Sequence, residues 1–288
     1  MKTILQLLRV QQYVKNIFIF LPLFFGVIIT DPPTFWRTLL AAGFFCLAAS
    51  AVYIFNDLLD IEEDRKHPLK KDRPLAAGKI SKGAALLLLA GLAVPALAGS
   101  YLLKSQVAAI LLVYMAMNVL YSSVLKHIAL IDVTVIAIGF ILRLFVGSSI
   151  SGVPLSIWII LMTFLLALFI ALAKRREDVL LYLEKGEISR KVIDGYNLEF
   201  LNIAMIVMAA VLIISYIMYT ISPEILARPN GHKTYLTVIL VILGILRYLQ
   251  LCLVFNNCGS PTKVLFKDRF LQAVIAVWIV TFWLLMYR

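Results

Sequence analysis

The sequence predicts an all-α integral membrane protein, because its apolar residues are too many and too clustered for a water-soluble chain. Hydrophobic residues make up 62% of the 288, which is more than a soluble domain with a polar shell requires. They form long runs, and about 20 apolar residues in a helix cross the roughly 30 Å hydrocarbon core of a bilayer. The runs lack the alternation of apolar and polar residues that barrel strands show, so we predict transmembrane helices.

We predict about nine transmembrane helices, one for each long apolar run. In chain order the runs cover 17–30, 36–56, 83–103, 105–125, 129–152, 155–173, 200–221, 234–255 and 270–287. The first run is short for a span unless its helix begins earlier, near Tyr13. Outside the runs no soluble domain is evident, so residues 1–288 are expected to form a single transmembrane domain with two long polar loops, at about 57–82 and 174–199.

The charged residues indicate how the chain lies in the membrane. The net charge is +11, but most Lys and Arg lie in the N-terminal segment and in alternate loops, which argues against a nucleic-acid partner. The positive-inside rule places the N-terminus and both long loops in the cytoplasm. We therefore expect a multi-pass protein of the cell membrane, in contact with membrane lipids and with its polar loops facing the cytoplasm.

Four polar residues at the end of the second predicted helix form a candidate metal site. If that helix continues past the membrane surface, Asn56, Asp57, Asp60 and Asp64 fall on one face. Neighbouring carboxylates repel one another, and oxygen ligands of this kind suit Mg²⁺. We therefore expect Mg²⁺ at all four residues and a catalytic role for the three aspartates. The alternative is a solvated acidic helix end, balanced by the basic pair that follows it.

Seven basic residues on the same predicted side could bind phosphate groups. Some of them must only set topology or attract anionic lipid headgroups, whereas cations beside a metal site would also hold a substrate with several phosphates. The seven are Lys70, Lys71, Arg73, Lys126, Lys174, Arg175 and Arg176. Arg73 and Lys174 are the stronger candidates, because they adjoin the helix ends that frame the site.

Arg143 lies near the middle of the fifth predicted helix, where a charge is costly and should face a partner or a water-filled cavity. We favour an interior, functional position over a structural pair or a snorkelling side chain. His67 follows the acidic face, and we interpret it as structural or as support for the metal site.

The acidic run resembles a known motif. Asn56-Asp57-x-x-Asp60-x-x-x-Asp64 on a second membrane helix is similar to the first aspartate-rich motif of the UbiA superfamily of intramembrane prenyltransferases, and nine helices fit that superfamily. The resemblance covers nearly the whole chain and is closer to one branch, the decaprenyl-phosphate phosphoribosyltransferases. The segments that resemble this branch are Gln12 to Asn16, Asp64 to Gly78, Tyr121 to Lys126, Leu142-Arg143, Lys174 to Glu177 and Tyr196 to Leu201.

One departure from the superfamily separates two enzymatic interpretations. Members that use prenyl diphosphate donors usually carry a second DxxxD-type motif after the sixth helix, where it holds a second metal. Here that place reads Lys174-Arg175-Arg176-Glu177-Asp178, a basic cluster without that spacing. Such a cluster suits a bare lipid phosphate better than a metal-bound diphosphate.

The resemblance implies transfer of 5-phosphoribosyl from phosphoribosyl pyrophosphate to a polyprenyl phosphate, with release of pyrophosphate. Mg²⁺ would hold the pyrophosphate at the acidic face, and the lipid phosphate, already an anion, would attack the anomeric carbon. In the family this product feeds the lipid-linked arabinose donors of the cell wall. The residues implied in substrate binding are Lys15, Asn16, Lys70, Arg73, Tyr121, Lys126, Arg143, Lys174, Arg175 and Glu177.

Two other functions stay open from the sequence. A UbiA-type prenyltransferase that moves a prenyl group from prenyl diphosphate to an aromatic or other small acceptor would share the first motif, but should need the missing second one. A transporter or channel would place polar residues near the bilayer midplane, whereas here they gather at predicted cytoplasmic helix ends, with Arg143 the main exception. The polyprenyl length and the oligomeric state stay open too, a homo-oligomer included.

Overall fold

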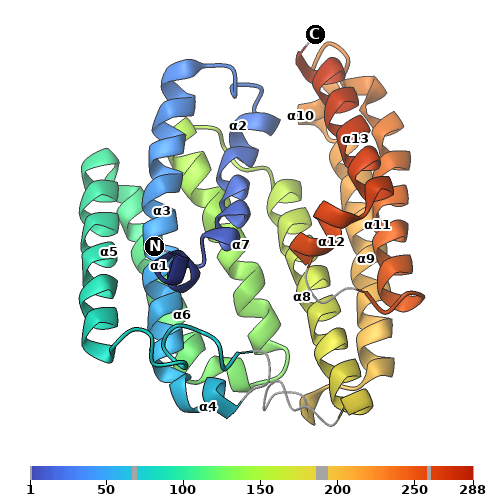
Figure 1. Cartoon of the computed structure of the whole chain (residues 1–288). Coiled ribbons are helices and arrows are strands. Elements are labelled where there is room, and N and C mark those ends of the chain that lie inside the picture. The colour runs from blue at the N-terminus through green and yellow to red at the C-terminus, as the bar shows by residue number, and fades with distance from the viewer. Residues whose placement is uncertain (1, 67–69, 186–193, 258–260, 288) are drawn as a thin grey trace. The chain divides into compact units, whose positions relative to one another are not determined.

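Helices account for all regular secondary structure in the part of the chain that the structure describes (Figure 1). This computed structural model describes residues 2–66, 70–185, 194–257 and 261–287. Eight helical segments are long and apolar enough to cross a bilayer, which confirms the predicted all-α membrane protein. They are α3 (Pro32–Leu59), α5 (Lys82–Leu103), α6 (Ser105–Ser123), α7 (Ile131–Ser151), α8 (Ile157–Lys185), α9 (Leu198–Thr220), η4 with α11 (Gly231–Thr237 and Val238–Leu253) and α13 (Arg269–Tyr287).

The first apolar run, predicted as one helix over 17–30, is divided instead. Val10–Phe20 forms the 3-10 helix η1, and Leu21–Phe25 forms the short α-helix α2. Pro22 contributes to this division, because it has no N–H to donate to the carbonyl four residues back. A 3-10 helix rises about 2 Å per residue and an α-helix about 1.5 Å, so the two segments together still extend roughly 30 Å.

The two polar segments predicted as loops are partly helical. In the first, α3 continues to Leu59 and the short helix α4 (Ile61–Lys66) follows it. In the second, α8 continues to Lys185, so the basic cluster that begins at Lys174 lies on a helix and not in a loop. Residues 186–193 lie outside the described part of the chain. The remaining short helices are α1 (Lys2–Leu8), η2 (Leu125–His127), α10 (Pro223–Leu226) and α12 (Pro261–Lys267).

The chain forms two compact units, and α7 contributes to both. The first unit comprises residues 1–126 and 138–155, and the second comprises residues 127–137 and 156–288. In the first unit, α3 packs against α5 and α6 through an apolar core that contains Phe45 and Tyr114. In the second unit, α8 packs along α9 around Phe169, Leu201 and Met205.

Within the first unit, η1 lies directly against α7. A Cβ on Gly147 of α7 would lie 1.9 Å from the carbonyl oxygen of Ile19, so only glycine allows the two backbones to approach this closely. This contact fixes the polar residues of η1, Lys15 and Asn16 among them, beside the middle of α7.

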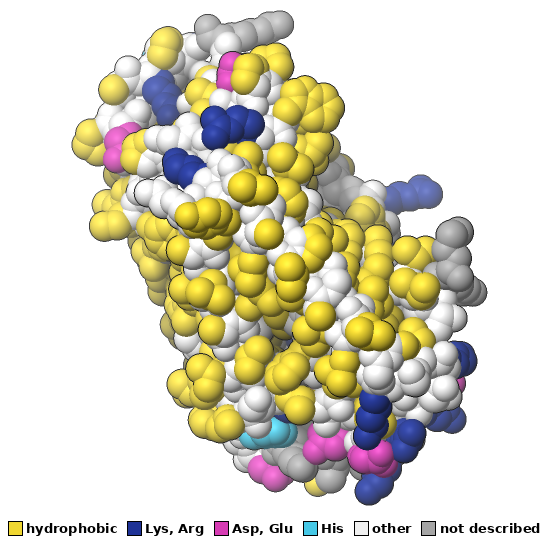
Figure 2. All heavy atoms as spheres, turned by 90° about the vertical axis from the view of Figure 1, so that its left-hand side faces the viewer, with side chains coloured by type: hydrophobic (Ala, Val, Ile, Leu, Met, Phe, Trp, Pro, Cys, Tyr) yellow, Lys and Arg dark blue, Asp and Glu magenta, His cyan; other side chains and the backbone are white. Residues whose placement is uncertain are grey.

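The outer surface carries large apolar side chains that water would not favour. Leu87, Leu102 and Ile157 are 78%, 85% and 74% exposed. Figure 2 shows hydrophobic side chains over the middle of the visible face and charged side chains toward its two ends. Exposed apolar area of this extent marks an interaction surface, and the acyl chains of a bilayer provide the matching partner.

Candidate active site

The acidic face at the end of α3 is almost continuous with α4. Asp60 follows the last residue of α3 with φ −94° and ψ 8°, which is a small departure from helical geometry. The N–H of Asp64 still donates to the carbonyl oxygen of Asp60 at 2.7 Å. The helical spacing is therefore largely kept, and the four polar residues extend over about two turns.

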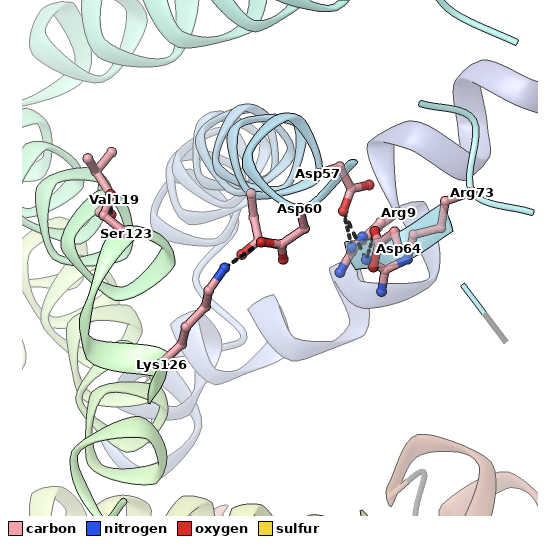
Figure 3. A network of polar contacts seen from close by, with 9 residues as sticks. Arg9, Asp57, Asp60, Asp64, Arg73, Val119, Ser123 and Lys126 are labelled. Carbon is pink, nitrogen blue, oxygen red and sulfur yellow. Dashed lines mark hydrogen bonds and ion pairs between the residues drawn. The ribbon is translucent and has the colours of Figure 1, made fainter. Parts of the chain in front are cut away.

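Asp57 and Asp64 form one group with two arginines (Figure 3). Arg73 Nη1 donates to Asp64 Oδ2 at 2.7 Å and to Asp57 Oδ1 at 3.3 Å. Arg9 forms an ion pair with the same oxygen of Asp57. Both carboxylate side chains are buried, at 3% and 4% exposed, whereas the two arginines keep about a quarter of their surface. The group thus presents accessible cations over buried carboxylates.

Asp60 and Asn56 form a second group with a lysine. Asn56 Nδ2 donates to Asp60 Oδ2 at 2.9 Å, and Lys126 of η2 forms an ion pair with Asp60 Oδ1. Figure 3 shows Asp60 pointing to a different side of the helix from Asp57. The predicted four-residue set therefore divides into two pairs, each neutralised by cations from elsewhere in the first unit.

The turn between α1 and η1 places Arg9 at the site. Arg9 has φ 51° and ψ 46°, a left-handed conformation that breaks the helix there. Ser50 of α3 donates to the carbonyl oxygen of Leu8 at 2.9 Å, and the Tyr13 hydroxyl lies 2.8 Å from Ser50 Oγ. The Arg9 guanidinium also lies 5.0 Å from the ring centroid of Tyr53. These contacts fasten the turn to the last turns of α3.

The loop after α4 positions Arg73. Leu75 and Ala76 are buried, and Arg65 Nε donates to the carbonyl oxygen of Ala76 at 3.1 Å. Gly78 has φ +69°, a conformation that strongly favours glycine. The loop is thus held by its own backbone and by the apolar cluster beneath it. His67 lies outside the described residues, so its predicted role stays untested.

The acidic face offers only oxygen donors, and this chemistry fits Mg²⁺. Asp57 and Asp64 already share one cationic nitrogen of Arg73. Within the described ranges, no three or more His, Cys, Asp or Glu side chains gather as they would around one metal. Because Mg²⁺ usually takes one or two protein carboxylates and completes its shell with water and substrate phosphates, the shared pair satisfies the protein side of such a site. The four-ligand set stays a prediction.

Arg143 is buried in the first unit, as its depth in α7 predicts. It is 5% exposed. Its Nε donates to Asn16 Oδ1 at 2.8 Å, and its Nη1 donates to the Gly139 carbonyl oxygen at 2.7 Å. The rings of Phe45, Tyr114 and Phe140 lie 4.6, 5.2 and 5.4 Å from the guanidinium carbon. Arg143 and Asn16, both predicted to bind substrate, are thus brought together.

The basic cluster on α8 belongs to the second unit, and its arginines are buried. Arg175 Nε donates to Asp132 Oδ2 at 2.6 Å, and its Nη1 donates to Asp178 Oδ2 at 2.6 Å. Tyr196 donates to the other oxygen of Asp132 at 2.6 Å and accepts from the N–H of Leu130 at 2.7 Å. Burial, and then the hydrogen bond to Asp132, raise the pKa of the Tyr196 hydroxyl above its usual value.

Arg176 is held differently from Arg175. Its three nitrogens donate to neutral oxygens, those of Asn202, Cys252 and Asn256, at 2.7, 2.8 and 3.0 Å. Lys174 is exposed, and Glu177 is half-buried on the same helix. The predicted phosphate cradle on α8 therefore contains two arginines with fixed protein partners and one accessible lysine.

The structure groups some predicted residues and adds others. Lys126 and Arg73 join the acidic face, while Lys70 and Tyr121 are half-buried in the first unit, and their roles in substrate binding stay predictions. The sequence analysis missed Arg9, Asp132 and the hydroxyl of Tyr196. Asp132 carries a usable signal, since it is an acidic residue within a predicted apolar span, and such a residue requires a partner.

Comparison with known proteins adds the family. Residues 19–254 match the UbiA prenyltransferase family. A protein named decaprenyl-phosphate phosphoribosyltransferase from Mycolicibacterium smegmatis is 33% identical over 82% of this chain and 76% of its own length. Proteins of the same name from Mycobacterium tuberculosis H37Rv and Corynebacterium glutamicum are 29% and 30% identical over 96% and 94% of this chain, and over 92% and 83% of their own lengths.

Solved structures show the same fold. A UbiA homolog from Archaeoglobus fulgidus, bound to DMAPP and Mg²⁺, superimposes with a TM-score of 0.73 and 20% identity over 98% of each chain. A digeranylgeranylglyceryl phosphate synthase gives a TM-score of 0.67 and 21% identity over 99% of this chain and 98% of its own. At these identities the likeness concerns the fold alone.

Proposed function

The chain belongs to the UbiA prenyltransferase family, and we propose that it transfers 5-phosphoribosyl from phosphoribosyl pyrophosphate to a polyprenyl phosphate, releasing pyrophosphate. Relatives that carry the name of this activity align with most of its length. A UbiA-type prenyltransferase acting on prenyl diphosphate is the second candidate, since solved structures of the same fold bind such donors.

The composition of α8 favours phosphoribosyl transfer over transfer from prenyl diphosphate. A second acidic motif would have to hold a second metal there, but Arg175 and Arg176 take that place. Of the two carboxylates in this segment, Asp178 already accepts from Arg175, and Glu177 directly precedes it, so the two lack the DxxxD spacing. Since this segment provides no pair of uncommitted carboxylates, a second metal-bound diphosphate lacks its ligands, and a single metal-bound pyrophosphate at the acidic face is the simpler arrangement.

We propose that Mg²⁺ binds at Asn56, Asp57, Asp60 and Asp64, where it would neutralise the charge that develops on the pyrophosphate leaving group. The cations that now neutralise these carboxylates have solvent access: Arg9, Arg73 and Lys126 are 25%, 27% and 12% exposed. Each can exchange a carboxylate oxygen for a phosphate oxygen, Arg through paired hydrogen bonds and Lys as a point charge.

The reaction itself needs little proton transfer. An oxygen of the lipid phosphate forms a bond to the anomeric carbon as the bond from that carbon to pyrophosphate breaks. The nucleophile is already an anion, so the protein contributes position and electrostatics more than a general base. We infer that Lys174, exposed on α8, contacts the lipid phosphate, while Arg175 supports the helix that carries it.

We also propose that the whole chain acts as one catalytic domain of the cell membrane with its polar site facing the cytoplasm. One family match runs through both units, and the distribution of Lys and Arg favours this orientation. A water-soluble donor would then reach the acidic face from the cytoplasm, while the polyprenyl chain stays in the bilayer.

A labelling assay tests the proposed reaction. Purified full-length protein is given Mg²⁺, a polyprenyl phosphate and phosphoribosyl pyrophosphate labelled in the ribose; a parallel sample receives labelled prenyl diphosphate and an aromatic acceptor. Ribose label should enter the lipid extract. Prenyl transfer without ribose incorporation would replace the proposal with the second candidate.

The same assay tests the metal. Asp60→Ala should lower turnover by about 100-fold or more, the loss expected for a group that stabilises charge in the transition state. EDTA should stop the reaction, and added Mg²⁺ should restore it. Asp72→Ala is the matched control, because Asp72 is exposed in the neighbouring loop. Full turnover in the chelator or in the Asp60 variant would remove the metal assignment.

A further inference from the structure

Two cations inside the first unit lie close together, with no acidic partner for either among the residues that the structure describes. Among the described residues, Arg143 contacts no carboxylate; its neighbours are Asn16, the Gly139 carbonyl and three aromatic rings. Lys15 is half-buried on η1, and the charges that act on it are those of Arg143 and Arg9, both positive. A buried cation without a counter-charge is costly, and beside a second cation it is more so.

The comparison with Arg175 shows that this arrangement is particular to the site. Arg175 is also buried, and two carboxylates lie 2.6 Å from its nitrogens. Arg176 contacts no carboxylate in the described part of the chain, but neutral oxygens accept from all three of its nitrogens. Arg143 has neutral acceptors at Nε and Nη1, and a side-chain hydrogen bond also joins it to Tyr114. Among the described residues Arg143 is thus a buried guanidinium with neutral partners, like Arg176, but it lies beside a second cation, Lys15.

The site is also built and held in place. Asn16 is 4% exposed; its Oδ1 accepts from Arg143, and its Nδ2 donates to Cys46 Sγ at 3.0 Å. The close approach of the Ile19 carbonyl to Gly147 fixes η1 on α7. Arg143 and Lys15 are therefore presented by two backbones in tight contact, which is the preorganisation that anion binding favours.

The position of the pair relates it to the acidic face. Arg9 contacts Asp57, and Lys15 follows six residues later, about 12 Å farther along η1 at the 3-10 rise. The Arg9, Lys15 and Arg143 side chains therefore form a series of cations that begins at the proposed pyrophosphate site and continues into the unit. An anionic group bound there would lie beyond the leaving group, on the same molecule or on the second substrate.

We propose that Lys15 and Arg143, with Arg143 oriented by Asn16, form a binding site for a phosphate monoester. The inference builds on the proposed function, whose substrates both carry such a group: the 5-phosphate of the donor and the phosphate of the lipid. The ligand supplies the missing negative charge, and its oxygens accept from the ammonium of Lys15 and the guanidinium of Arg143.

Binding measurements with the full-length protein in detergent test this site. The probes are ribose 5-phosphate and a short-chain prenyl phosphate, with ribose and the corresponding prenol as neutral controls. Lys15→Met should weaken binding of one phosphate about tenfold, and Lys15→Arg should keep most of the affinity. Lys104→Met is the matched control: this lysine lies in the same unit, but it donates to the Ser149 carbonyl oxygen at 2.6 Å and not to the site.

The two phosphate probes identify the source of the ligand. If only ribose 5-phosphate binding weakens, the site takes the donor; if only prenyl phosphate binding weakens, it takes the lipid. Unchanged binding of both in Lys15→Met overturns the proposal. These binding measurements need no turnover. An unchanged affinity in Lys15→Met can therefore be told apart from a failure of ribose transfer in the labelling assay.

Two further readouts separate a binding role from a structural one. Without ligand, Lys15→Met should melt at the same or a higher temperature than the wild type, because a repulsion with Arg143 is removed; a lower melting temperature would indicate a structural role. On the wild-type protein, acylation of Lys15 followed by mass spectrometry should slow with the bound phosphate and not with its neutral counterpart. Equal acylation in all four samples would also overturn the proposal.

Discussion

Both units contain arginine–aspartate pairs, and the pairs of Arg73 and of Arg175 differ in their access to solvent. In the first unit, Arg73 is 27% exposed above the buried carboxylates of Asp57 and Asp64. In the second, the side chains of Arg175 and Asp132 are 2% and 0% exposed. An arginine that water reaches can exchange one oxyanion for another, whereas breaking a sealed pair leaves a buried charge alone. The difference assigns exchangeable contacts to the Arg73 group of the first unit and a fixed contact to the Arg175–Asp132 pair of the second.

The largest expected effect tests the fixed pair. Arg175→Ala should lower the free energy of unfolding by about 3–5 kcal/mol, because Asp132 is left buried and charged. Thermal and denaturant unfolding in detergent measure this loss. The adjacent Lys174→Ala is the control; Lys174 is exposed, so its loss should stay within about 0.5 kcal/mol. Equal stability of the two variants would contradict the comparison, and weaker use of lipid phosphate in Lys174→Ala alone would sharpen it.

The architecture could be predicted because it depends on length and composition. Runs of about 20 apolar residues have few alternatives to a membrane helix, and eight of the nine predicted runs form such helices. Helix ends were less accessible. A helix does not stop where apolar residues stop: α8 continues through its charged residues to Lys185 because Arg175 and Arg176 find partners there. Pro22 contributes to the division of the first run for a local reason, the missing N–H of proline.

For the candidate site, the sequence predicts only the features that depend on neighbouring residues. The register of Asp57, Asp60 and Asp64 follows from helical geometry. Their partners do not, since Arg9 and Lys126 lie 48 and 66 positions away from the aspartates that they contact. On α8, adjacent residues point in directions about 100° apart. Which of them is buried depends on helices that are distant in the sequence. The sequence therefore could not separate the buried Arg175 from the exposed Lys174.

A smaller effect tests the exchangeable contacts. Arg73→Lys should raise the KM for phosphoribosyl pyrophosphate about tenfold, since a lysine cannot contact two oxyanions through a planar fork, while the melting temperature stays near that of the wild type. Steady-state kinetics of ribose transfer measure the change. Arg37→Lys, an exposed position near the opposite end of α3, is the control and should leave KM unchanged. A large fall in stability with unchanged KM would make Arg73 as fixed as Arg175.

The last expected effect concerns Tyr196, which completes the fixed network and whose loss costs less than that of Arg175. Tyr196→Phe removes the donor to Asp132 and the acceptor for Leu130, and should cost about 1–3 kcal/mol near neutral pH, because buried polar groups lose their partners. The pKa of the Tyr196 hydroxyl is raised by burial and then by Asp132, so the folded protein holds this proton at pH values where the unfolded chain, with a tyrosine pKa of about 10, releases it. The stability that this hydroxyl contributes to the wild type is therefore complete below pH about 10 and declines above it.

Unfolding measured from pH 7 to 11 should show the wild type more stable than Tyr196→Phe, with a difference in free energy of unfolding that narrows above pH about 10. Tyr235→Phe, at a 57% exposed position of the same unit, should show no gap. A gap of constant size across the range, or none at pH 7, would mean that the hydroxyl is not part of the network that seals Arg175.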